Sequence, residues 1–232
     1  MLSRVHYARI EEENGRFLLK KAVDPTKDQS YVLYNFTQEQ LAHTLMPLGG
    51  YNKDWVRQKA EELGLGVAHK PDSQEICFVE DDDYAKFITD YSGYKPKEGD
   101  ILDVNGNVIG KHRGLIYYTI GQRKGIGAYG RPMFVMKIDA ENNTITLGEK
   151  GMEFSNELTA YDVNFVSGEF PKENMLITAK VRYQAPPAAA MLCPQKDGTV
   201  KLMFPEPQRA VTPGQAVVFY DGDIVLGGGT VL

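Results

Sequence analysis

The second half of the chain is divided into short apolar runs by turn sequences, and this pattern restricts it to an all-β fold. From Gly99 onward the runs recur at nearly regular spacing, with Asp-Gly, Pro-Gly and Asn-Gly pairs between them. Several short strands spaced in this way are typical of a small β-barrel. The strand candidates are 176–183, 199–204, 216–220 and 224–226, and hairpins are expected at 103–108 and 133–148.

The first half mixes strand-like runs with helix signals, which is typical of an α/β segment. Thr37 followed by Gln40 is a capping-box sequence and predicts a helix start. Residues 54–64 place apolar side chains at helical spacing and end in glycine, so they predict a second helix. The acidic run 80–83 precedes a third helix, and capping explains its acids better than metal binding. Residues 31–34 fit either a buried strand or a helix start.

Composition excludes several classes of protein. The 232 residues contain no apolar run of about 18 residues and no signal-peptide core at the N-terminus, so neither a membrane span nor export is expected. Two cysteines, Cys77 and Cys193, are too few for a disulfide-stapled secreted fold. We therefore expect a cytoplasmic protein.

A local basic strip stands out against the net charge of −5. Residues 104–138 contain no acid, and their cations are interleaved with aromatic rings. Such a strip favours a polyanion with stackable bases, but an ordinary solvated sheet face fits equally well. Its basic members are Lys111, His112, Arg113, Arg123, Lys124, Arg131 and Lys137, and its rings are Tyr117, Tyr118, Tyr129 and Phe134.

Few residues suggest chemistry by spacing alone. Cys77 follows a polar loop and fits either a reactive thiol or a buried small hydrophobe, whereas Cys193 fits only the second role. The histidines lack metal-ligand spacing, so no metal site is expected. The glycines at 121–127 lack the order of a nucleotide-binding loop, although they allow close backbone approach to a ligand.

The order of local motifs is more specific than any one of them. Along the chain follow His6-Tyr-Ala-Arg, Lys27-Asp-Gln-Ser-Tyr, Pro47-Leu-Gly, Lys53 with Val56-Arg57, Ser73-Gln-Glu-Ile-Cys-Phe, Gly110-Lys-His-Arg-Gly and Tyr118-Thr-Ile-Gly-Gln-Arg-Lys-Gly. In this order the chain resembles the tRNA-specific 2-thiouridylase family (tRNA-uridine 2-sulfurtransferases). The resemblance covers essentially the whole chain and is strongest from Lys27 to Gly127.

The resemblance implies an α/β remnant plus β structure. Its parts would be the C-terminal part of an adenine-nucleotide α-hydrolase-like (ATP-pyrophosphatase-type) domain, a small central domain and a C-terminal β-barrel. Residues 1–43 and 66–82 would belong to the first, 44–65 and 83–145 to the second, and 146–232 to the third.

The resemblance also implies an activity. Family members use ATP, with magnesium, to activate the C2 oxygen of the wobble uridine of certain tRNAs. A cysteine persulfide, charged by a sulfur relay or a cysteine desulfurase, then supplies the sulfur of 2-thiouridine. Matched motif by motif, Cys77 falls on the persulfide-carrying cysteine. The positions matching tRNA contacts are His6, Lys27, Asp28, Gln29, Arg182, Tyr183 and Gln215.

The chain also departs from the family pattern. It lacks the Ser-Gly-Gly-x-Asp-Ser loop that holds the nucleotide and the second catalytic cysteine, and Val5 stands where the family has a glycine. A β-branched residue cannot copy the backbone freedom of glycine. We therefore expect a chain without most of the ATP domain that binds no cofactor tightly and does not thiolate tRNA alone. The alternative is a non-catalytic tRNA-binding remnant, and a third is a redox switch pairing Cys77 with Cys193.

Overall fold

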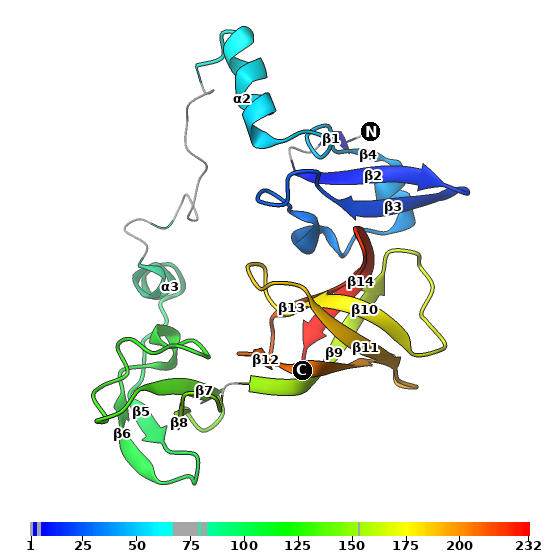
Figure 1. Ribbon diagram of the computed structural model, residues 1–232. Coiled ribbons are helices and arrows are strands. Elements are labelled where there is room, and N and C mark those ends of the chain that lie inside the picture. The colour runs from blue at the N-terminus through cyan, green and yellow to red at the C-terminus, as the bar shows by residue number, and fades with distance from the viewer. Residues whose placement is uncertain (1, 4–5, 67–78, 80–82, 153) are drawn as a thin grey trace. The chain divides into compact units, whose positions relative to one another are not determined.

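The computed structural model describes residues 2–3, 6–66, 79, 83–152 and 154–232 (Figure 1). The chain forms two compact units. The first combines residues 1–70 with 156–232, and the second contains residues 71–155. Val5, Cys77 and residues 80–82 lie outside the described residues.

Six strands of the first unit close into a β-barrel. β14 pairs with both β9 and β13, and this double pairing closes the order β13-β10-β11-β12-β9-β14 into a ring. The strands are β9 (Phe154–Phe165), β10 (Met175–Lys180), β11 (Ala188–Pro194), β12 (Val200–Arg209), β13 (Ala216–Asp221) and β14 (Ile224–Val231). The expectation of a C-terminal β-barrel is therefore confirmed.

Alternate residues of these strands fill the barrel. Leu192 of β11 and Leu202 of β12 are fully buried and belong to one apolar cluster. The alternation follows from the pleat, which turns successive side chains to opposite faces. β14 crosses this region with three glycines, and a Cβ on Gly228 would lie 2.5 Å from the ring of Tyr34 and 2.6 Å from the carbonyl oxygen of Val217. Only glycine permits this close packing.

β13 is buried on both of its faces. Val217 and Phe219 point into the barrel, whereas Val218 and Tyr220 join a second apolar cluster with Leu19. A nearly continuous apolar run is the sequence signature of a strand covered on both sides. The N-terminal segment therefore packs against the outside of the barrel, within the same unit.

A hairpin carries this N-terminal packing. β2 (Ala8–Glu13) and β3 (Arg16–Lys21) are joined by Asn14 and Gly15, both with positive φ, as a two-residue hairpin turn requires. Asp223 ties the hairpin to the barrel, since its carboxylate lies 2.5 Å from Arg9 Nη2 and its carbonyl accepts from Lys21 N–H at 2.8 Å.

Short elements follow the hairpin. They are the 3₁₀ turn η1 (Ser30–Leu33), α1 (Gln38–Ala42), β4 (Thr44–Leu45), which pairs in parallel with β1 (Leu2–Ser3), and α2 (Lys53–Glu62). The capping box of Thr37 and Gln40 forms as predicted. Residues 31–34 form neither predicted element, because η1 is a single tight turn. The second predicted helix forms as α2, and none of its residues is buried.

The second unit contains a four-stranded sheet of order β6-β5-β8-β7. Its elements are α3 (Tyr84–Ser92), β5 (Gly99–Leu102), β6 (Val108–His112), the 3₁₀ turn η3 (Leu115–Tyr117), β7 (Met133–Asp139) and β8 (Thr144–Glu149). Ile101, Val135, Ile145 and Leu147 form its core. Both predicted hairpins are present, and the turn of the first spans residues 103–107. Among the residues described, no helix is long and apolar enough to span a membrane.

Candidate nucleic-acid interface

Asp28 organises the loop between β3 and η1. Its Oδ1 accepts hydrogen bonds from the backbone N–H of Ala22 at 3.0 Å and of Ser30 at 3.2 Å, and its Oδ2 accepts from Ser30 Oγ at 2.9 Å. Ser30 is fully buried and lies 3.5 Å from the hydroxyl of Tyr220. The carboxylate of Asp28 therefore fixes the backbone of residues 22–30 against the barrel.

Gln29 connects the same loop to the chain next to His6. Its side-chain oxygen accepts from the backbone N–H of Tyr7 at 2.9 Å, and its own N–H donates to the carbonyl of Tyr7 at 2.8 Å. Two reciprocal bonds of this kind hold residues 6–7 beside residues 28–29. The resemblance singles out His6 and the stretch Lys27 to Gln29 separately. These bonds bring the two segments side by side.

The barrel supplies its share through Tyr183, which lies just after β10. The Tyr183 hydroxyl donates to the backbone carbonyl of Asp28 at 3.4 Å. Its ring meets the ring of Tyr31 edge to face, with centroids 5.7 Å apart, and the Tyr31 hydroxyl donates to the carbonyl of Ala216 at 2.6 Å. Burial raises the pKa of Tyr31 to about 12, so this hydroxyl keeps its proton.

Two lysines lie over tyrosine rings in this region. Lys180 Nζ is 5.7 Å from the centroid of Tyr31 and 5.6 Å from that of Tyr183, and Lys21 Nζ is 4.3 Å from that of Tyr220. Burial lowers the pKa of Lys180, and the negative charge of Asp28 acts in the opposite direction. A partly desolvated cation held by aromatic faces is well suited to a phosphate group.

Three polar atoms of the expected contact residues are buried without a hydrogen-bond partner among the described residues. They are His6 Nδ1, Arg182 Nε and Gln215 Oε1. A buried polar atom without a partner costs about 1–3 kcal/mol, so few occur in native proteins and each calls for an explanation. Within the described part of the chain, the outer end of Arg182 donates one long bond, from Nη2 to the carbonyl of Arg209 at 3.4 Å.

We call this group the Tyr31 cluster. Its members come from the loop after β3, from η1 and from the end of β10, and they are Lys27, Asp28, Gln29, Tyr31, Lys180, Arg182 and Tyr183. His6 is joined to it through Tyr7, and Gln215 precedes the Ala216 carbonyl that binds Tyr31. Tyr31 and Lys180 were missed by sequence reasoning. The only signals for them were an aromatic residue two positions after Gln29 and a cation two positions before Arg182.

The basic strip of residues 104–138 is less basic in space than in sequence. Nζ of Lys111 lies 2.5 Å from Asp100, Nη1 of Arg131 lies 2.6 Å from Glu149, and Nζ of Lys137 lies 3.1 Å from Asp139. In the sequence, Asp100 precedes the acid-free residues 104–138, and Asp139 and Glu149 follow them. Strand pairing places Asp100 and Glu149 next to their cations, and Asp139 lies in the same strand as Lys137. The strip as a whole is therefore not a continuous cationic surface, and only parts of it carry unpaired cations.

His112 does not belong to that surface. It is 1% exposed, its Nε2 lies 2.9 Å from the carbonyl of Asn143, and its Nδ1 accepts from Gly114 N–H at 3.1 Å. Both ring nitrogens are used inside the second unit. Its assignment to the basic strip is wrong, because its partners make it a core histidine.

The N-termini of the described α-helices carry side-chain caps. Anions bind helix N-termini whose N–H groups are open. Thr37 and Gln40 cap α1, and the N–H groups at the start of α2 are taken by Asn52 and Asp24. Asp83 likewise caps α3, and no metal-ligating cluster occurs within the described ranges.

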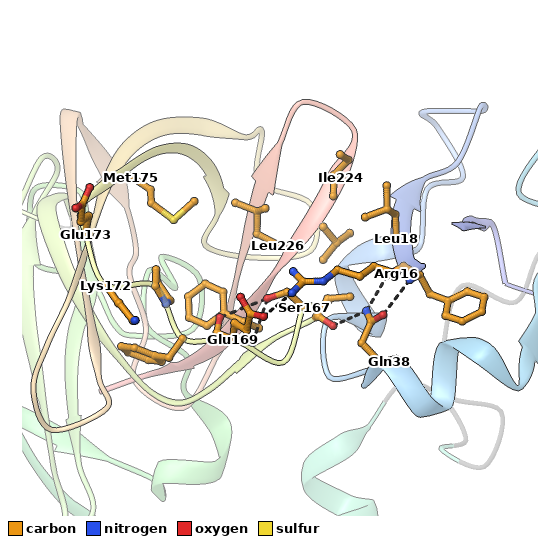
Figure 2. Close-up of a pocket in the computed structure, with 16 residues that line it drawn as sticks. Arg16, Leu18, Gln38, Ser167, Glu169, Lys172, Glu173, Met175, Ile224 and Leu226 are labelled. Atoms are coloured by element: carbon orange, nitrogen blue, oxygen red, sulfur yellow. Dashed lines mark hydrogen bonds and ion pairs between the residues drawn. The ribbon is translucent and has the colours of Figure 1, made fainter. Parts of the chain in front are cut away.

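An apolar groove of about 530 Å³ lies elsewhere on the first unit (Figure 2). Arg16 and Glu169 form an ion pair at its rim, and Gln38 spans its wall with bonds to the carbonyls of Phe17 and Val166, both at 2.8 Å. None of the expected contact residues lines it. It is therefore distinct from the Tyr31 cluster.

Cys193 lies in β11 opposite Lys201 and is a free, half-buried thiol. It does not belong to the buried core of the barrel, so its expected role as a buried small hydrophobe stays a prediction. The expected role of Cys77 is not tested, because Cys77 lies outside the described residues.

Comparison with known families covers nearly the whole chain. Residues 1–81 match the model described as the tRNA methyl transferase HUP domain, residues 85–149 the tRNA methyl transferase PRC-barrel domain, and residues 155–231 the aminomethyltransferase beta-barrel domain.

Curated relatives match all three parts together. The chain is 58% identical over 229 residues to the tRNA-specific 2-thiouridylase MnmA of Acetivibrio thermocellus, covering 97% of this chain and 64% of that protein. It is 54% identical to the MnmA of Clostridioides difficile and 55% identical to MnmA 1 of Thermoanaerobacter sp., in each case over 97% of this chain and 63% of the relative. The chain thus spans slightly less than two thirds of the length of these relatives.

Proposed function

The chain belongs to the tRNA-specific 2-thiouridylase family, and from this premise we propose that it is the tRNA-holding and sulfur-accepting part of a tRNA-uridine 2-sulfurtransferase. Its substrate would be tRNA, modified to 2-thiouridine at the wobble position. The reaction would take place in the cytoplasm, with a sulfur relay or cysteine desulfurase as donor.

The observation that supports tRNA binding is the meeting of Asp28 and Tyr183 in the Tyr31 cluster. The family resemblance points to both segments independently, and they are 155 positions apart in the sequence. Their contact joins the two segments that we propose to contact tRNA. We assign His6, Lys27, Gln29, Arg182, Tyr183 and Gln215 to that surface, together with Lys180.

Each type of side chain in the cluster would have its own task. Arg182 offers a guanidinium that can pair with a phosphate through two parallel hydrogen bonds. Tyr183 is 43% exposed and presents a ring on which an unpaired base can stack. Asp28 has a different task from its neighbours, because both oxygens of its carboxylate accept hydrogen bonds from Ala22 and Ser30. We therefore treat Asp28 as a positioning residue.

Sulfur transfer is assigned to Cys77 on the family motif Ser73-Gln-Glu-Ile-Cys-Phe. A thiolate there would accept sulfur as a persulfide, the form in which a cysteine carries transferable sulfur. ATP, with magnesium, is the cofactor that the family uses to activate the uridine. No step of this proposal passes through ATP.

One experiment tests the sulfur-accepting role. The chain is incubated with a cysteine desulfurase and cysteine, and its intact mass is measured with and without reductant. We expect one reducible sulfur on the wild type and on Cys193→Ala, and none on Cys77→Ala. Equal loading of the wild type and Cys77→Ala would contradict the assignment.

The alternative function is a non-catalytic tRNA-binding protein. The Tyr31 cluster supports this alternative equally, because it bears on tRNA binding and not on sulfur transfer. Under this alternative tRNA binds, but Cys77 takes up no sulfur. In both cases we expect no 2-thiouridine when the chain alone is incubated with ATP, a sulfur donor and unmodified tRNA. Nucleoside analysis of the tRNA decides this point.

A further inference from the structure

A polar concavity lies in the second unit, on the loop that precedes β7. We call residues 123–131 the glycine loop. It encloses about 340 Å³, and its lining includes Arg123, Gly127, Tyr129 and Arg131. Nothing in the family comparison assigns a role to it.

The loop is held in shape from its base. Gln122 Oε1 accepts from the backbone N–H of Thr119 at 2.8 Å, and its Nε2 donates to the carbonyls of Tyr117 at 3.3 Å and Lys124 at 2.8 Å. Gly121 N–H donates to the carbonyl of Val135 at 2.7 Å, which ties the same base to β7. Ile126 is 4% exposed and anchors the loop in the core of the unit. A ligand would therefore meet a preformed surface.

The backbone of the loop has unused donors. No backbone N–H group of residues 123–131 donates a hydrogen bond to a described residue outside this loop. Gly125, Gly127 and Gly130 have φ values of +73°, +101° and +69°, which residues with a side chain rarely adopt. Left-handed residues within a turn are typical of backbone that presents N–H groups to an anion, and this backbone lines the concavity.

The side chains of the loop add positive charge. Arg123 and Lys124 are exposed and make no ion pair within the described part of the chain. They differ in this from Lys111 and Lys137 of the same unit, which are paired with acids. Arg131, which lines the concavity, is paired with Glu149, and both side chains are at least half exposed.

From these observations we propose that the glycine loop binds a phosphodiester group of the RNA backbone. The backbone N–H groups and Arg123 would hold the phosphate oxygens, and Lys124 would contribute charge. A site of this kind recognises the backbone and not the base sequence. The inference deepens the proposed function and rests on tRNA being the substrate.

Inorganic phosphate is the first probe. Amide resonances of the ¹⁵N-labelled 232-residue chain are followed during a phosphate titration at constant ionic strength. We expect saturable shifts in residues 123–131 and none in the turn at 103–107. Gly130→Ala places a Cβ at a positive φ in open space, and Gly106→Ala makes the same change in that turn. We expect about a threefold or greater loss of phosphate affinity for Gly130→Ala only, because the strain disturbs the concave backbone.

Unmodified tRNA is the second probe. Its affinity is measured over a range of salt for the wild type, for Arg123→Gln with Lys124→Gln, and for Lys111→Gln with Lys137→Gln. Both double variants lose two positive charges from the same unit. Each lost phosphate contact reduces the salt slope by about one, so we expect a reduction of up to two for the loop variant and little change for the control.

The outcomes separate the two proposals. If Gly130→Ala matches Gly106→Ala toward phosphate, and the Arg123→Gln, Lys124→Gln variant matches its control toward tRNA, the inference is overturned and the proposed function stands. If the wild type does not bind tRNA, the proposed function fails. In that case phosphate shifts confined to the loop would still support an anion site there, and their absence would overturn it.

Discussion

The hydroxyl of Tyr183 donates to the backbone carbonyl of Asp28 at 3.4 Å, and so joins the end of β10 to the loop after β3. The carboxylate of Asp28 faces the other way and binds Ala22 and Ser30. The side chain of Asp28 thus holds the loop in shape, and its backbone carbonyl binds Tyr183 of the barrel. The relationship explains why the barrel and the N-terminal segment present the residues proposed to contact tRNA as one surface.

Replacing Tyr183 tests whether its ring stacks on a base. Tyr183→Ala removes the ring, and we expect tRNA affinity to fall by about 1–3 kcal/mol, roughly 5- to 150-fold. Tyr183→Phe keeps the ring and its edge-to-face contact with Tyr31, so its affinity should stay close to wild type. Filter binding at fixed salt measures both. Equal losses for the two variants would show that the hydroxyl, and not the ring, is used.

Replacing Asp28 tests its positioning role. Asp28→Ala leaves the N–H groups of Ala22 and Ser30 without their acceptor, and we expect the free energy of unfolding to fall by about 1–3 kcal/mol. Urea unfolding measures the loss. Asp54→Ala, which removes a side chain that is 94% exposed, should change stability by no more than about 0.5 kcal/mol.

The same Asp28→Ala variant distinguishes positioning from direct contact. Its salt slope for tRNA binding should match that of the wild type even where its affinity is lower, because no phosphate contact is removed. A change in slope with unchanged stability would contradict the positioning role.

The close packing of β14 predicts a strict requirement at Gly228. A Cβ there would lie 2.5 Å from the ring of Tyr34, so Gly228→Ala should destabilise the first unit by about 1–3 kcal/mol through overpacking. Gly50→Ala meets no atom within 4 Å and does not lie at a positive φ. Thermal unfolding of both variants checks this prediction, and similar melting temperatures would contradict it.

Asp139 predicts an acid-dependent step in the second unit. The backbone N–H of Asn142, aided by hydrogen bonds from Lys137 and the Asn142 side chain, lowers the pKa of Asp139 from its ordinary 3.8 to about 2. A carboxyl whose pKa is lower in the folded state stabilises the fold above about pH 4, and this stabilisation is lost as the pH falls toward 2. Asp139→Asn should therefore show a shallower loss of stability over this range.

The acid titration has a matched control in the same unit. Asp90→Asn changes an exposed carboxylate of α3 that has no hydrogen bond to a described residue, so it should keep the steepness of the wild type. Stability is followed by urea unfolding at each pH. Identical pH profiles for Asp139→Asn and the wild type would count against the account of Asp139.

Local signals in the sequence predicted most of the elements. The capping box of Thr37 and Gln40 predicted α1. The helical spacing of apolar residues predicted α2, which begins directly after Asn52. The missed elements have mixed signals. β9 carries polar residues along both faces and a positive φ at Asp162, and β11 opens with three alanines. The Asn14-Gly15 turn was a clear hairpin signal that the sequence analysis overlooked.

The candidate site could be predicted only in its parts. Arg182 and Tyr183 would have read as a strand end without the family resemblance, and the structure places them just after β10. No periodicity relates Tyr183 to Asp28, because their contact depends on the packing of the hairpin against β13 and β14. The assignment of residues 44–65 to the central domain stays a prediction, as does the role of Cys77.

The most direct test of the account is the affinity of the 232-residue chain for unmodified tRNA as a function of salt, with Arg182→Gln and Arg16→Gln compared. Arg182 belongs to the Tyr31 cluster, whereas Arg16 lies at the rim of the separate groove. We expect salt-dependent binding whose slope falls by about one for Arg182→Gln and is unchanged for Arg16→Gln. Equal affinities and slopes for the two variants would contradict the account.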